Sequence, residues 1–240
     1  MDVMSPEFWL ALGTIIFIDL ILAGDNAIVI GMAARKLPAQ QQKKAILWGT
    51  FGAVAIRIVA TLLVVKLLEI PGLQLAGGLL LVWIAYKLLV NEDNHKDIQA
   101  KDSLWAAVRT IVVADAAMGI DNVIAIAGAA HGEFILVIIG LLISVPIVVW
   151  GSTLFIKLVN KFPPIVYIGS GILAYTAGKM ITHEPFIHGW FANPAVYWAF
   201  LAVVIAGVLA AGKLRNSRMA AAGAKHPTPS SNSASSSESV

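Results

Sequence analysis

The chain lacks cysteine entirely and is poor in charged residues. The absence of cysteine excludes thiolate metal ligands, catalytic thiols and disulfides. Charged residues make up only 13% of the 240 residues, against roughly 25% in an average soluble domain, whereas hydrophobic residues make up 58%. Because so few charges cannot cover the surface of a water-soluble domain of this size, we expect lipid to cover most of the exterior.

Seven apolar stretches are long enough to cross a bilayer, which takes about 20 residues of helix. The predicted fold is therefore an all-α polytopic membrane protein, with a transmembrane transport domain over residues 1–214. The polar, serine-rich segment 215–240 has too few apolar residues to build a core, so we expect a disordered cytoplasmic tail. The predicted spans cover about 8–34, 44–69, 72–90, 104–130, 134–159, 164–181 and 194–214.

The basic residues predict how these spans are oriented. They gather in the connectors after the first, third, fifth and seventh spans, which all lie on one side of the membrane, whereas the other side has only Lys66 and Lys179. By the positive-inside rule, we expect the N-terminus outside and the C-terminus in the cytoplasm, in the inner or plasma membrane of the cell. The basic residues of the four connectors are Arg35, Lys36, Lys43, Lys44, Lys96, Lys101, Lys157, Lys161, Lys213, Arg215, Arg218 and Lys225.

The first and fourth spans carry the same motif. Residues 19–30 read DLILAGDNAIVI and residues 115–126 read DAAMGIDNVIAI, so both follow the pattern D-x5-D-N-x-I-x-I. A repeat of three spans enters the membrane from opposite sides in its two copies, which is an inverted-topology repeat typical of secondary transporters. We expect repeat one over about 8–90, repeat two over about 104–181, and a seventh helix outside the duplication.

Four aspartates lie in predicted hydrocarbon: Asp19, Asp25, Asp115 and Asp121. Each charge at a helix centre costs about 2.5–3.5 kcal/mol on insertion scales, so these side chains must face a polar interior and have partners. Arg57, in the middle of the second span, can offset one carboxylate. A bound divalent cation, or protons, would supply the remaining positive charge.

Helical geometry limits how the motif residues meet. On a straight helix Asp19 and Asn26 share a face, and Asp25 lies about 120° away. The second motif repeats this relation. We hypothesise that the helices unwind locally near Gly24 and Gly119, which would let the carboxylates converge at the midplane.

Small residues recur at helical spacing on several of the predicted spans. On the second span they precede Arg57 at intervals of four, so we expect Arg57 to point into the bundle as a counter-ion to an aspartate or as part of a structural pair. Gly140, Ser144 and Ser152 form a similar stripe on the fifth span, which we interpret as a packing surface.

The ligand chemistry narrows the identity of the ion. Carboxylate and amide oxygens suit Mn²⁺, Mg²⁺ and Ca²⁺, whereas zinc and copper favour Cys or His. The residues alone leave Mn²⁺, Ca²⁺ and Mg²⁺ open. All five histidines fall in predicted loops or the tail: His95, His131, His183, His188 and His226.

The two motifs resemble the paired signatures of the TerC family of integral membrane proteins, and the short form of the chain resembles the YjbE branch of that family. The resemblance covers all seven spans. It implies export of manganese, and carries a cation site onto the matching positions Asp19, Asp25, Asn26, Asp115, Asp121 and Asn122.

We expect a secondary exporter that exchanges the metal for another cation, with protons as the candidate. Its partners are the divalent cation and the lipid bilayer, with no nucleic acid, no organic cofactor and an open oligomeric state. No enzymatic activity is expected, and nothing resembles a phosphate-binding loop.

Two other functions compete with transport. The first is a membrane scaffold or a metallation factor for exported proteins, in which the acidic core would be structural. An intramembrane aspartyl protease would also need two membrane aspartates. The protease is disfavoured because Ile18, not tyrosine, precedes Asp19, and because no Pro-Ala-Leu segment occurs.

Overall fold

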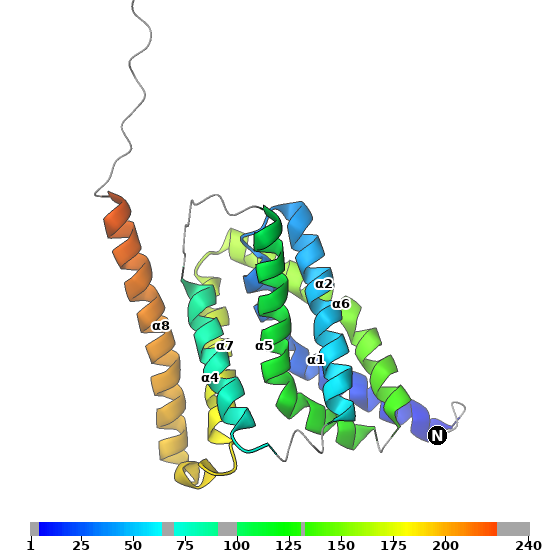
Figure 1. Cartoon of the computed structure of the whole chain (residues 1–240). Coiled ribbons are helices and arrows are strands. Elements are labelled where there is room, and N and C mark those ends of the chain that lie inside the picture. The colour runs from blue at the N-terminus through cyan, green and yellow to red at the C-terminus, as the bar shows by residue number, and fades with distance from the viewer. Residues whose placement is uncertain (1–4, 64–69, 91–99, 131–132, 225–240) are drawn as a thin grey trace, which may run out of the picture.

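The computed structural model describes residues 5–63, 70–90, 100–130 and 133–224, and within these ranges all regular structure is helical (Figure 1). The predicted all-α class is therefore confirmed. The elements are α1 (Pro6–Ala34), α2 (Ala39–Leu62), α4 (Leu73–Leu89), α5 (Ala100–Ala129), α6 (Phe134–Lys161), α7 (Ile165–Thr182), the short 3₁₀ helix η1 (His188–Phe191) and α8 (Pro194–Ala224).

Four of the described helices are long and apolar enough to cross a membrane, namely α2, α6, α7 and α8, and the bent α1 makes a fifth. The helix α4 is apolar but has only 17 residues, or about 26 Å at 1.5 Å per residue, slightly less than the hydrocarbon thickness of about 30 Å. Charged residues such as Asp115 interrupt the apolar sequence of α5. The number of seven spans stays a prediction.

The outer face of the bundle is apolar. Large hydrophobic side chains such as Phe17, Phe51, Trp150 and Val203 are more than 60% exposed. A surface of this kind belongs in lipid, because a soluble protein rarely leaves such extended apolar areas open to water. The described part of the chain therefore has the surface of an integral membrane protein.

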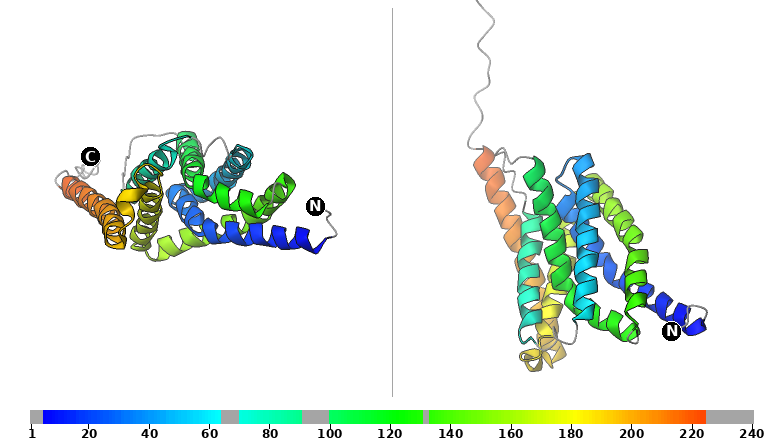
Figure 2. Two further views of the ribbon diagram at one scale, coloured as in Figure 1. Left: turned by 90° about the horizontal axis from the view of Figure 1, so that it is seen from below. Right: turned by 45° about the vertical axis from the view of Figure 1, so that its right-hand side comes forward.

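The helices of the first half pack mainly against helices of the second half. The most extensive contacts join α1 to α6, α2 to α5 and α4 to α7, and α8 packs on α7. Figures 1 and 2 show α8 at one end of the bundle and the N-terminus at the other. The helices α1, α2, α5 and α6 all pack against one another.

The helix α1 bends by 46° between its segments Pro6–Leu20 and Gly24–Ala34. It remains helical throughout, as does α5. The prediction of unwound segments near Gly24 and Gly119 is therefore wrong. The change of direction in α1 therefore lies just before Gly24, within one helix.

Side chains from other parts of the chain bond both ends of α4. At its N-terminus, the buried Glu184 carboxylate accepts the backbone N–H groups of Gly72 at 2.9 Å and Leu75 at 3.1 Å. At its C-terminus, Arg35 donates to the Leu88 carbonyl oxygen at 3.0 Å. Asn216 likewise donates to the Leu89 carbonyl oxygen and Lys36 to that of Val90, at 3.3 Å each. Negative charge at the first turn and positive charge at the last both oppose the helix dipole, so they stabilise this short helix.

The last helix is longer than the sequence predicted. We expected α8 to end near residue 214 with a disordered tail from 215, but the helix continues to Ala224. Alanines favour helix in this stretch, and Asn216 is fixed by its hydrogen bond to the Leu89 carbonyl. The rest of the predicted tail, 225–240, lies outside the described residues.

Close contact between α4 and α7 predicts the outcome of Gly78→Ala. The added Cβ would lie 2.8 Å from the Ala177 backbone oxygen and 2.6 Å from Ile181 Cγ1, so the two helices would have to separate. We expect a loss of about 1–3 kcal/mol, which lowers the thermal midpoint by about 2–4 °C per kcal/mol. The control is Gly207→Ala in α8, where a Cβ meets no atom within 4 Å. Equal midpoints for both variants would contradict the packing.

The cap on α4 predicts the effect of Glu184→Gln. Glutamine retains one acceptor oxygen but loses the charge at the helix N-terminus, which is worth up to about 2 kcal/mol when partly buried. Thermal unfolding of the purified protein should show a lower midpoint for Glu184→Gln and a still lower one for Glu184→Ala, which leaves two N–H groups unpaired. An unchanged midpoint in both variants would show that the cap contributes nothing.

Candidate functional site

Arg57 lies at the centre of the bundle because small residues precede it on one face of α2. Ala45, Gly49 and Ala53 are buried, and a Cβ added at Gly49 would lie 2.7 Å from Ile111 Cδ1 of α5. This close approach of α2 to α5 places the Arg57 side chain, 5% exposed, between the helices and not in lipid.

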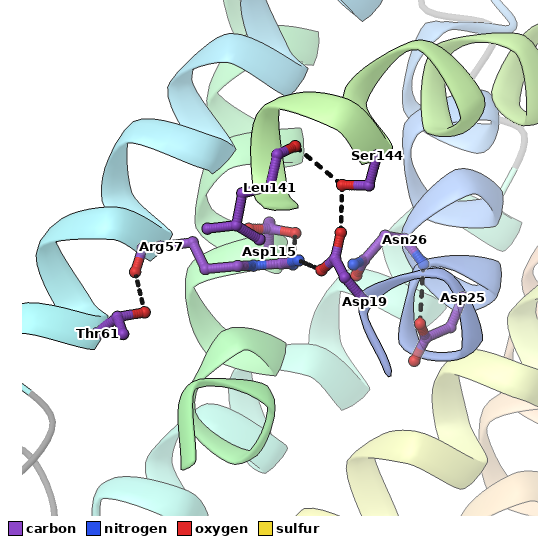
Figure 3. Close-up of polar contacts among 8 residues, drawn as sticks. All are labelled: Asp19, Asp25, Asn26, Arg57, Thr61, Asp115, Leu141 and Ser144. Carbon is purple, nitrogen blue, oxygen red and sulfur yellow. Dashed lines mark hydrogen bonds and ion pairs between the residues drawn. The ribbon is translucent and has the colours of Figure 1, made fainter. Parts of the chain in front are cut away.

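The guanidinium of Arg57 joins two carboxylates from different halves of the chain. Its Nη1 lies 2.6 Å from Asp19 Oδ1 on α1, and its Nη2 lies 2.5 Å from Asp115 Oδ1 on α5 (Figure 3). Asp19 is 1% exposed and Asp115 is 7% exposed. The first aspartate of each motif thus lies in a single buried cluster with one shared cation.

Ser144 of α6 completes the surroundings of Asp19 by donating its hydroxyl to Asp19 Oδ2. The packing role that we predicted for Ser144 is therefore incomplete, because this hydroxyl bonds a charged group. This role has little signal in the sequence, since a serine in a stripe of small residues is equally suited to close packing. Four helices, α1, α2, α5 and α6, meet at this cluster.

Asp25 does not join the cluster. Figure 3 shows its carboxylate beside the Asn26 backbone and apart from Arg57, with no contact drawn between them. It accepts the backbone N–H of Asn26 at 2.9 Å and the hydroxyl of Thr176, on α7, at 3.4 Å. The expected convergence of Asp25 with Asp19 is wrong, because helical periodicity persists through the bend and still separates the two side chains.

The asparagines of both motifs are buried. Asn26 is 3% exposed and Asn122 is 7% exposed. The side chain of Asp121, the remaining predicted ligand, lies outside the described residues. Among the side chains that the structure does describe, no three of Asp, Glu, His and Cys come together as a metal-binding group. Metal binding by the six predicted residues stays a prediction.

The helices, the lipid-compatible exterior and the buried ionic cluster define an integral membrane protein with a polar centre. The profile of the integral membrane protein TerC family matches residues 4–220. The chain therefore belongs to the TerC family, as its two motifs indicated.

Curated relatives agree with this assignment. The chain is 52% identical to the uncharacterized membrane protein YjbE of Bacillus subtilis over 181 residues, which are 75% of this chain and 83% of the relative. It is 25% identical to the uncharacterized membrane protein YkoY of the same organism over 232 residues, covering 82% and 70% of the two chains. It is also 25% identical to the inner membrane protein YgdQ of Escherichia coli over 209 residues, covering 78% and 86%. No solved structure matches the chain.

The buried cluster predicts that Arg57→Met is strongly destabilising. Removal of one partner leaves two carboxylates uncompensated in the bundle, at a cost of about 3–5 kcal/mol. The thermal midpoint of the purified protein should fall by roughly 10 °C. Arg57→Lys should be intermediate, because it keeps the positive charge but has one ammonium nitrogen in place of the two guanidinium nitrogens that contact the two carboxylates.

A charge-neutral control separates lost attraction from lost packing. Arg57→Met combined with Asp19→Asn and Asp115→Asn removes all three charges, so most of the lost midpoint should return. A triple variant as unstable as Arg57→Met alone would show that the arginine acts through packing and not through charge.

Proposed function

We propose that this protein is a secondary transporter that exports a divalent metal cation, with Mn²⁺ as the leading candidate. We place it in the cell membrane, with its N-terminus outside and its C-terminus in the cytoplasm. The observation that carries the proposal is the meeting of Asp19 and Asp115, the same position of two repeated motifs, in the buried centre of the bundle. A fold that gathers carboxylates inside the membrane needs cations beside them.

Helix packing supports the inverted 3+3 repeat that such transporters use. If α1, α2 and α4 correspond to α5, α6 and α7, exchanging the halves turns the α1–α6 contact into the α5–α2 contact and leaves α4–α7 unchanged. These are the three most extensive contacts in the described bundle. In this arrangement α8 lies outside the repeat.

Details of the packing follow the same exchange. Ile15 and Ile111 each lie four residues before the first aspartate of a motif. A Cβ added at Gly140 of α6 would lie 2.5 Å from Ile15 Cγ2, and one at Gly49 of α2 would lie 2.7 Å from Ile111 Cδ1. Each half thus presses a glycine against the isoleucine that precedes the aspartate of the other half, which supports a site at the interface of two repeats.

The second carboxylate of each motif is the better candidate for direct contact with a transported ion. Asp19 and Asp115 already share Arg57, whereas Asp25 has no salt bridge within the described residues. It also lies at the bend of α1, between α1 and α7. We therefore propose that Asp25 and Asp121, with Asn26 and Asn122, form the oxygen ligands of Mn²⁺, and that Asp19 and Asp115 contribute negative charge beside them.

The coupling reaction follows from the same chemistry. Carboxylates that release the metal bind another cation in exchange. Protons are the candidate, because a carboxylate binds either a metal or a proton. No phosphate-binding loop was found in the sequence, which fits a gradient-driven carrier better than one driven by nucleotide hydrolysis.

Mn²⁺ flux into liposomes that contain the purified protein tests the proposal. The parent should transport Mn²⁺, and Asp25→Asn and Asp121→Asn should each lower the rate by about tenfold or more, since even outer partners of metal ligands matter by that factor. The matched control is Glu7→Gln, which neutralises an exposed acid in the first turn of α1.

Two results would contradict the proposal. Parent flux no higher than that of protein-free liposomes, with pH gradients of either sign, would favour a scaffold or metallation factor. Flux that survives both substitutions would place the ion path away from the second aspartates.

A further inference from the structure

The Asp25 carboxylate has a polar neighbour on α7 that the repeated motif does not indicate. The hydroxyl of Thr176 lies 3.4 Å from Asp25 Oδ2, whereas Asp25 Oδ1 accepts the backbone N–H of Asn26. Both side chains are half-buried. The pair lies apart from the Arg57 cluster, since neither Asp25 nor Thr176 lines the small cavity that α1, α2, α5 and α6 form beside that cluster.

The hydroxyl of Thr176 is directed differently from those of threonines in the other helices. Thr14, Thr61 and Thr153 each donate to the carbonyl oxygen four residues earlier in their own helix, at 2.8–2.9 Å. This bond within one helix is the usual choice of a threonine in a helix interior. Thr176 instead donates across to Asp25 on α1. Its oxygen is therefore placed beside the carboxylate and not held by its own backbone.

The spacing of the two oxygens is long for a hydrogen bond and suits two ligands of one cation. A hydroxyl and a carboxylate oxygen that share a strong hydrogen bond lie about 2.5–3.0 Å apart. Neighbouring oxygens around an octahedral cation lie about 1.4 times the metal–oxygen distance apart, which is about 2.9 Å for Mg²⁺ and about 3.3–3.7 Å for Ca²⁺. The observed 3.4 Å therefore fits a divalent cation larger than Mg²⁺.

Charge and space also favour a cation at this position. Asp25 has no salt bridge within the described part of the chain, and the neutral hydroxyl of Thr176 cannot compensate its charge. An uncompensated carboxylate is costly inside a membrane. Open space lies on the neighbouring surface of α1, because a Cβ added at Gly24 would meet no atom within 4 Å. A cation beside Asp25 would compensate the charge and use that space.

The internal repeat provides this hydroxyl in one half only. The sequences of α4 and α7 both follow the pattern G-x3-L-x-[WY]-x-A-x-K, over residues 77–87 and 169–179. In this alignment Ile84 occupies the position of Thr176, and Ile84 is buried and apolar. The two motifs of the repeat are therefore not equivalent, because α7 offers an oxygen where α4 offers a hydrocarbon side chain.

We propose that Thr176 Oγ1 and Asp25 Oδ2 are neighbouring ligands of the transported cation, and that the hydroxyl favours Mn²⁺ over the smaller Mg²⁺. This inference rests on the proposed function, since it names a further ligand of the same cation. Mg²⁺ requires short bonds in near-ideal octahedral geometry and keeps several of its waters, so it gains little from two oxygens that lie this far apart. The larger cation gains a bond to each.

Equilibrium binding to the purified full chain tests the ligand. Free Mn²⁺ is followed by its electron paramagnetic resonance signal, and Mg²⁺ by its competition with Mn²⁺. Thr176→Val keeps the shape of the side chain and removes the oxygen, so the Kd for Mn²⁺ should rise by about tenfold. The Kd for Mg²⁺ should stay within about twofold of the parent value.

Two further variants separate the oxygen from the packing of α7. Thr176→Ser retains the hydroxyl and should bind Mn²⁺ nearly as tightly as the parent. The matched control is Thr182→Val, which makes the same change at a buried threonine of α7 whose hydroxyl donates to the Lys179 carbonyl oxygen at 2.8 Å. This control should bind both metals like the parent.

Three results would overturn the inference. Equal Mn²⁺ affinity of the parent and Thr176→Val would remove the hydroxyl from the site and leave the proposed transport standing. An equal loss of Mn²⁺ and Mg²⁺ affinity in Thr176→Val would show that Thr176 does not select between the metals. A parent that binds no Mn²⁺ would overturn the proposed function as well, which distinguishes that failure from the other two.

Discussion

The shared ion pair of Arg57 with Asp19 and Asp115 is the interaction on which the rest of the bundle depends. Charges inside a membrane are tolerated only where protein surrounds and compensates them, so the helices must pack in a way that brings these three side chains together. That requirement brings α1, α2 and α5 to one point and draws in α6 through Ser144. It also explains why these helices approach so closely at Gly49 and Gly140, because bulkier residues there would hold the charged groups apart.

A second constraint acts on α4, which is too short to end in water on both sides without help. Its N-terminus lies against Glu184, which follows α7, and its C-terminus lies against Arg35, which follows α1. Each cap comes from a different half of the chain. The pairing of α4 with α7 therefore rests on specific hydrogen bonds at both ends as well as on apolar contact, so α4 is positioned along its axis and not only sideways.

The sequence was sufficient for features that depend on local pattern and on the cost of burying charge. Long apolar runs predicted the helices, and helical periodicity placed Asp19 and Asn26 on one face, where both line the same cavity. The sequence failed where the answer depends on tertiary contacts. Glycine near Asp25 was compatible with an unwound segment or a bend, and only packing of the helices decides between them. Ser144 and Glu184 gave no local sign of the distant groups that they bond, and the helical residues after 214 depend in part on the contact of Asn216 with α4.

The duplicated motif and the single arginine together make the centre of the bundle asymmetric. Asp19 has partners for both oxygens, Arg57 and Ser144, whereas Asp115 has a partner for only one within the described residues. Two equivalent aspartates therefore differ in how many hydrogen bonds each still lacks. In the membrane interior, where an unpaired polar atom is costly, that difference makes Asp115 Oδ2 the carboxylate oxygen of the cluster that still lacks a partner within the described residues. The unpartnered oxygen of Asp115 is thus a consequence of placing one guanidinium between two copies of the same motif.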